Sequence, residues 1–179
     1  MVTNAVTATV SVGDWPEGTA ITPDGSRAYA VNARSDAVSV IEAVSNTVVR
    51  TLSVGGYSVA VEVTPDGKNV YVSACALDPN AVVIDTATNL VSRKITTGVR
   101  PGYMAISPDG ARLYVTSIDS STSAKVLVVD TPSNSVVETI SVPWAVGPDG
   151  GCLPTARVSM SRSRAFRARC RSSTPVPMR

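Results

Sequence analysis

The chain has 179 residues, of which 44% are hydrophobic and only 4% aromatic, and its formal net charge is +2. This length suffices for one domain with a hydrophobic core, and no segment approaches the roughly 20 apolar residues of a membrane-spanning helix. The sequence contains no histidine, which excludes the His-dependent catalytic triads and the usual general base near neutral pH. Because Val and Thr are abundant and favour strands, we expect an all-β fold.

The N-terminal residues 1–13 carry the end of a pattern that recurs along the chain. Asn4 and Val10 stand six residues apart, and the same spacing returns in every later unit. We therefore predict that this stretch is the outer strand of a preceding unit. It lacks the basic start and the continuous apolar core of a secretory signal, so the chain as written is expected to stay in the cytoplasm.

Three repeat units follow, at residues 14–55, 56–97 and 98–142. Each contains a Pro-Asp-Gly turn with a tyrosine six residues after the proline, and successive prolines are 42 and 43 residues apart. An alternating apolar run then ends in an acidic residue, and an asparagine stands four residues further on. In chain order these residues are Pro23, Tyr29, Glu42 and Asn46; Pro65, Tyr71, Asp85 and Asn89; and Pro108, Tyr114, Asp130 and Asn134.

Each unit is predicted to form four antiparallel strands, which we name A to D. Strand A is expected near residues 19–22, 60–64 and 104–107, ahead of each Pro-Asp-Gly turn. Proline and glycine favour the A–B turn, and asparagine suits the left-handed position of the C–D hairpin. Four strands in about 42 residues match one blade of a β-propeller. The sequence therefore predicts a partial β-propeller with three four-stranded blades and an N-terminal strand of a preceding blade.

The tyrosines open short motifs that carry a family resemblance. These motifs are Tyr29-Ala-Val-Asn, Tyr71-Val-Ser and Tyr114-Val-Thr-Ser. Together with the Ser/Thr-Pro-Asp-Gly turns they make residues 1–142 similar to the YVTN-repeat β-propeller family. The resemblance implies a surface-layer, periplasmic or secreted binding protein. Lactonase-like enzymes and quinoprotein subunits share related repeats.

The B–C and D–A connections form the candidate binding face. The distance from tyrosine to acid across B–C varies from 13 to 16 residues, whereas the A–B and C–D spacings are constant. Loops of variable length commonly carry binding residues. We predict that this face binds a protein or a small ligand, although its aromatic residues could instead pack between blades. The candidate residues are Trp15, Arg34, Asp36, Tyr57, Arg100 and Tyr103.

The acidic residues that recur in every blade are expected to cap turns rather than to bind a metal. No P-loop and no GxGxxG motif occurs, and Cys75 is expected to be a packed small side chain. We therefore expect a non-catalytic binding or structural module without cofactor, metal or membrane partner. The alternatives are a remnant of a lactonase-like or quinoprotein-type enzyme and nucleic-acid binding through the basic tail. Three blades do not close a ring, so the end blades favour self-association.

The repeat fails near the C-terminus. A fourth unit starts at residues 143–150 with Pro148-Asp149-Gly150, but no tyrosine or alternating run follows. Residues 151–179 contain seven arginines and no acid, whereas all 14 acidic residues precede them. We predict that this Arg- and Ser-rich segment is disordered. Three interpretations of this segment compete: a shifted reading frame or truncated gene, a disordered linker, and a basic arm for nucleic acid.

Overall fold

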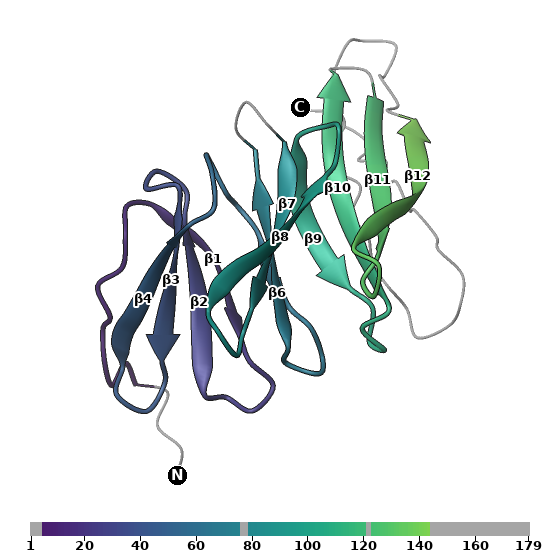
Figure 1. The fold of residues 1–179 in the computed structure, drawn as a ribbon. Coiled ribbons are helices and arrows are strands. Elements are labelled where there is room, and N and C mark those ends of the chain that lie inside the picture. The colour runs from purple at the N-terminus through teal and green to yellow at the C-terminus, as the bar shows by residue number, and fades with distance from the viewer. Residues whose placement is uncertain (1–4, 76–78, 121–122, 144–179) are drawn as a thin grey trace, which may run out of the picture. The chain divides into compact units, whose positions relative to one another are not determined.

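A computed structural model describes residues 5–75, 79–120 and 123–143, and all regular structure in this part of the chain is β-strand. Twelve strands form three antiparallel sheets of four consecutive strands each (Figure 1). We call these sheets blades 1, 2 and 3. Blade 1 contains β1 (Pro16–Ile21), β2 (Arg27–Asn32), β3 (Ala37–Glu42) and β4 (Thr47–Ser53). Blade 2 contains β5 (Val61–Val63), β6 (Asn69–Ala74), β7 (Asn80–Asp85) and β8 (Leu90–Thr96). Blade 3 contains β9 (Pro101–Ile106), β10 (Arg112–Ser120), β11 (Ser123–Asp130) and β12 (Ser135–Pro143).

The three sheets confirm the predicted all-β class and the order of strands A to D. Strand A differs in length between blades, since β5 has three residues and β9 has six. In blade 3 it begins at Pro101, three residues before the predicted residue 104. The predicted N-terminal strand of a preceding blade stays a prediction, because residues 1–4 lie outside the described residues and residues 5–12 pair with no strand in the described part of the chain. Each of the three sheets is already complete with four consecutive strands and leaves this segment no partner.

The turns between strands follow the predicted turn chemistry. The glycine of each Pro-Asp-Gly turn has a positive φ, at Gly25, Gly67 and Gly110. The hairpin asparagines Asn46, Asn89 and Asn134 adopt the left-handed region, with φ of 52°, 51° and 52°. This conformation is uncommon for other non-glycine residues, which explains why asparagine recurs there.

Two apolar layers join the blades. The layer between blades 1 and 2 contains Val31 and Val40 from one sheet and Val72 and Ile84 from the other. The layer between blades 2 and 3 contains Tyr71 and Val83 on one side and Leu113 on the other. Since side chains alternate along a strand, the central sheet contributes one face to each layer.

A polar contact accompanies each apolar layer. The hydroxyl of Tyr29 in blade 1 donates a hydrogen bond to Oδ1 of Asn89 in blade 2, at 2.7 Å. The hydroxyl of Tyr71 in blade 2 donates to Oδ1 of Asn134 in blade 3, at 2.9 Å. The repeating tyrosine and asparagine therefore connect neighbouring blades.

The predicted start of a fourth blade at residues 143–150 lies outside the described residues, apart from Pro143, where β12 ends. The predicted disordered tail at residues 151–179 also lies outside them. No helix in the described part of the chain could cross a membrane.

Candidate functional site

The D–A connections place a large side chain at the same position in every blade. Trp15, Tyr57 and Arg100 each stand eight residues before the proline of the following turn. Trp15 and Tyr57 have positive φ values of 57° and 44°, which is unusual for bulky side chains. Their side chains are 50% and 53% exposed, so neither is enclosed between blades. The backbone therefore holds two aromatic rings at the surface in an unfavourable conformation.

The B–C loop of blade 1 supports Trp15. The guanidinium carbon of Arg34 lies 4.4 Å from the centroid of the Trp15 ring, which is a cation–π contact. The backbone N–H of Ala33 donates to the carbonyl of Trp15 at 2.9 Å, and that of Asp14 donates to the Ser35 hydroxyl at 2.6 Å. Arg34 is exposed, and no carboxylate pairs with it among the described residues. Its guanidinium edge therefore has free donors.

Asp36 connects this loop to the next blade. Its Oδ1 accepts a hydrogen bond from the backbone N–H of Tyr57 at 2.9 Å, and its carbonyl accepts one from Val54 at 3.0 Å. Asp36 itself has a positive φ of 52°. Trp15, Arg34, Asp36 and Tyr57 therefore form one continuous surface across blades 1 and 2, which we call the loop-face cluster.

Arg100 is exposed at the D–A position before blade 3, next to Pro101 at the start of β9. The backbone N–H of Cys75 donates to the carbonyl of Gly56, beside Tyr57, and the Cys75 thiol donates to the carbonyl of Pro101. Burial raises the pKa of the Cys75 thiol, while the charge of Arg100 acts in the opposite direction. The cysteine is thus half-buried, hydrogen-bonded and protonated at neutral pH, which suits a structural role.

Tyr103 was predicted to lie in a loop, but it lies within β9. Its neighbour Met104 packs towards blade 2, so strand alternation places Tyr103 on the opposite face, where its side chain is 77% exposed. The corresponding residues of blades 1 and 2 are Gly18 and Ala60. The sequence places this residue wrongly because strand A starts earlier in blade 3 than in blade 2.

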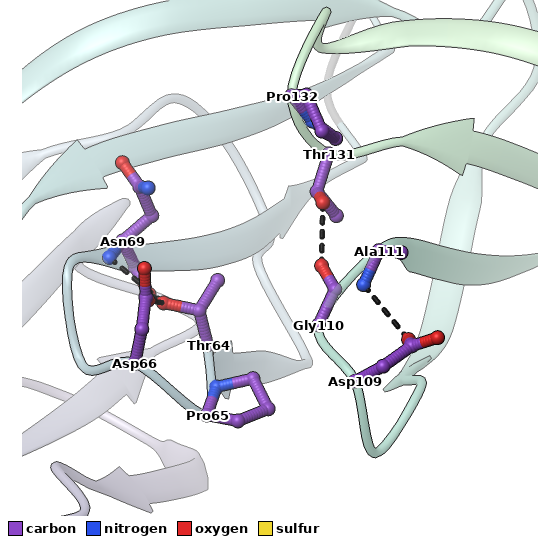
Figure 2. Close-up of a pocket in the computed structure, with 9 residues that line it drawn as sticks. All are labelled: Thr64, Pro65, Asp66, Asn69, Asp109, Gly110, Ala111, Thr131 and Pro132. Carbon is purple, nitrogen blue, oxygen red and sulfur yellow. Dashed lines mark hydrogen bonds between the residues drawn. The ribbon is translucent and has the colours of Figure 1, made fainter.

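The opposite face carries two cavities between the turns of neighbouring blades. The larger, about 320 Å³, lies between blades 2 and 3 and is lined by Thr64, Pro65, Asp66, Asn69, Asp109, Gly110, Ala111, Thr131 and Pro132 (Figure 2). The smaller, about 210 Å³, is bounded by the corresponding turns of blades 1 and 2. Because a cavity recurs at each pair of blades, we ascribe both to the spacing of the turns.

We call the side of the blades that carries the A–B and C–D turns the hairpin face. As predicted, the carboxylates of its Pro-Asp-Gly turns accept hydrogen bonds within those turns. Asp24, Asp66 and Asp109 each accept a hydrogen bond from the backbone N–H two residues later, at 3.0, 3.1 and 2.9 Å. Hydrogen bonds from Thr64 to Asp66 and from Ser107 to Asp109 lower the pKa of both acids. Within the described ranges no group of three or more His, Cys, Asp or Glu residues is arranged to hold a metal ion.

The arrangement of sheets resembles parts of solved structures. A structure of Kuenenia stuttgartiensis hydrazine synthase is similar, with a TM-score of 0.69 and 32% identity over 75% of this chain and 41% of that chain. A structure of U3-55K has a TM-score of 0.61 and 17% identity over 70% of this chain and 38% of that chain. The chain has a β-propeller-like fold. It spans about two fifths of the length of these structures. No protein-family model and no curated protein matches the sequence.

Two buried polar side chains of the propeller blades also lie next to the loop face. Asn32 and Ser117 each stand three residues after the tyrosine of strand B, opposite Pro16 and Pro101. Asn32 Oδ1 and Ser117 Oγ have no hydrogen-bond partner in the described residues, and Asn32 uses only its amide, which donates to Ser39 at 2.9 Å. Pro16 follows Trp15 and Pro101 follows Arg100, so both unpaired atoms lie beside the D–A positions of the loop face.

The sequence analysis missed Glu62. It lies in the inner strand β5, where blades 1 and 3 carry Ala20 and Ala105, and burial raises its pKa. A comparison of the blades position by position would have found it, because Glu62 is a charged residue where the other blades have alanine.

Proposed function

We propose that the chain is a non-catalytic binding module of a YVTN-type β-propeller, and that the loop-face cluster contacts its ligand or partner. The observation that carries the proposal is the pair Trp15 and Tyr57, two half-exposed aromatic side chains at matching positions with positive φ. Strained backbone conformations cluster at functional sites, where the surrounding structure maintains them. Trp, Tyr and Arg are also the residues that dominate binding energy at protein interfaces.

The chemistry of the cluster supports recognition rather than catalysis. Arg34 offers free donors beside an aromatic ring, and the unpaired Oδ1 of Asn32 lies next to the same connection. Both features suit a ligand with polar and apolar parts. The sequence has no histidine to act as a general base, which favours a binding role.

An enzyme component is the alternative function, because the chain is 32% identical to part of a hydrazine synthase structure. The chain spans 41% of that structure, so the similarity does not transfer the activity to it. An activity screen of the purified chain against lactones and quinoprotein substrates would separate the two functions. Turnover that survives the loss of Trp15 and Tyr57 would overturn the binding proposal.

The test uses a phage-displayed peptide library and a glycan array, with the fluorescence of Trp15 as a local signal. The sequence has two tryptophans, so Trp144→Phe leaves Trp15 as the single indole. Ligands selected on this variant are expected to change its fluorescence. Their affinity should fall about 30-fold or more on Tyr57→Ala, the loss typical of an interface hot spot.

Asp66→Asn is the matched control, because Asp66 lies on the hairpin face between the cavities. This variant is expected to leave the affinity unchanged. Ligands that lose affinity on Asp66→Asn but not on Tyr57→Ala would place the binding surface on the hairpin face and contradict the proposal.

A further inference from the structure

The joint between neighbouring blades is built twice in the same way. Tyr29 donates to Asn89 across the first joint and Tyr71 donates to Asn134 across the second. A proline of one turn also abuts the glycine of the next. A β-carbon added to Gly67 would lie 3.3 Å from Pro23 Cδ, and one added to Gly110 would lie 3.1 Å from Pro65 Cδ. Each joint therefore has a donor side and an acceptor side.

The two ends of the three-blade array carry unmatched halves of this joint. Tyr114 of blade 3 corresponds to Tyr29 and Tyr71, but its hydroxyl has no partner among the described residues. Asn46 of blade 1 corresponds to Asn89 and Asn134 and is exposed. The blade 1 turn is equally open, since a β-carbon on Gly25 would have no atom within 4 Å.

The apolar part of the joint is also exposed at the blade 1 end. Ile21 precedes its turn proline by two residues and is 63% exposed. The corresponding residues Val63 and Ile106 pack against the preceding blade. Ile21 is therefore the contact residue of a joint whose other side is missing from the described structure.

We propose that a second copy of this chain completes the joint, with Tyr114 of one copy donating to Asn46 of the other. Each copy carries both halves, so two copies make two identical joints related by a twofold axis and close a six-bladed ring. Rings of about four to eight blades are the normal range of propellers, and closed cyclic pairs are the commonest oligomers. This surface is separate from the loop-face cluster, so either proposal can fail without the other.

On both end faces the exposed residues lie at the hairpin end of the blade. Near the loop end of blade 1, Gly13 lies against Asn32, and Asn32 is fully buried. At the hairpin end, Ile21 and Asn46 remain exposed. On blade 3 Val126 and Val128 are buried, whereas Tyr114 is partly exposed. The hairpin ends therefore present the accessible surface for a second copy.

Tyr103 marks a steric difference from the internal joints. At the corresponding position of blade 1, a β-carbon on Gly18 would lie 3.0 Å from the carbonyl oxygen of Val59 in blade 2. Glu17 is the equivalent of Val59 in a second copy. The larger Tyr103 side chain must therefore turn out of the joint, in keeping with its exposure in the single copy.

The test is sedimentation equilibrium of the full chain over a wide concentration range, together with two variants. Tyr114→Phe removes the donor, and Asn46→Gly removes the acceptor while keeping a residue that accepts φ of 52°. We expect a reversible pair of copies in the parent. Loss of one hydrogen bond at each joint should weaken the pair about 10- to 100-fold in either variant.

A mixture of the two variants gives the decisive result. One joint of a mixed pair combines Tyr114→Phe with Asn46→Gly, but the other joint keeps both native partners. The mixed pair should therefore be about 3- to 10-fold tighter than the pair of either variant alone. Tyr29→Phe is the control, because it removes a bond inside one copy and should lower the midpoint of unfolding without weakening the pair.

A parent that stays monomeric at every concentration would overturn the proposal. So would a pair that both variants leave unchanged, or a mixture that is no tighter than the single variants. Masses that grow beyond two copies with concentration would overturn the closed ring, because an open head-to-tail contact forms chains.

Discussion

The two faces of the propeller blades differ in how strictly their residues repeat from blade to blade. On the hairpin face every blade repeats the same parts, and the Pro-Asp-Gly acids make the same hydrogen bonds in all three turns. On the loop face the same position holds Trp15, Tyr57 and Arg100 in successive blades. The hairpin face thus repeats what each blade needs to fold, whereas the loop face varies at positions that folding leaves free. Departures from the repeat are therefore the best guide to function in this chain.

The largest effect is expected from truncating a buried tyrosine of the repeat and, for comparison, an exposed tyrosine of the loop face. Tyr71 is fully buried and hydrogen-bonded to Asn134, so Tyr71→Ala should lower the free energy of unfolding by about 3–5 kcal/mol. Tyr57→Ala should change it by less than about 0.5 kcal/mol, because the ring is exposed. Urea denaturation of both variants measures the difference. Equal losses would show that Tyr57 also holds the fold together.

A smaller effect is expected from relieving the backbone at Tyr57. Since φ is 44° there, Tyr57→Gly removes a steric penalty and should raise the free energy of unfolding by up to about 1 kcal/mol. Tyr103→Gly is the control, because Tyr103 lies in a strand and glycine there should cost up to about 1 kcal/mol. Thermal unfolding of the pair gives the sign of each change. A loss of stability on Tyr57→Gly would mean that the ring contributes more than the strain costs.

The smallest effect concerns the acidity of the hairpin face. Hydrogen bonds from Thr22 and Ser26 lower the pKa of Asp24 to about 2, from an unfolded value near 3.8. A lowered folded pKa means that the ionised form stabilises the fold above about pH 4, and this contribution disappears as the pH falls towards about 2. Asp24→Asn should therefore make stability fall less steeply across this window in acid titrations followed by circular dichroism. An unchanged slope would show that Asp24 contributes nothing to acid unfolding.

The repeat spacing predicted the strands and turns because those features depend on local residues. A proline, a glycine and an asparagine at fixed positions determine their own backbone angles, and Gly67 and Asn89 adopt the conformations expected of them. Four of the predicted binding residues, Trp15, Arg34, Asp36 and Tyr57, lie in the D–A and B–C connections of blades 1 and 2, and their binding role stays a prediction. That they form one contact chain depends on bonds between residues 21 apart in sequence, which spacing does not reveal.

Other features required the tertiary structure. The positive φ of Trp15 and Tyr57 contradicts their intrinsic preferences, so no local rule predicts it. The register of β9 depends on its pairing with β10, and this placed Tyr103 on a sheet face instead of a loop. The partnership of each tyrosine with an asparagine about 60 residues later emerges only when neighbouring blades are seen side by side.

The tyrosine-to-asparagine bonds also indicate the order in which the blades assemble. In both observed bonds the donor belongs to the earlier blade and the acceptor to the later one. The N-terminus of a chain leaves the ribosome first, and structural units generally fold in the order of their synthesis. Each finished blade would thus display its hydroxyl before the next hairpin emerges. We expect the blades to assemble one after another as they leave the ribosome, each serving as the template on which its successor docks.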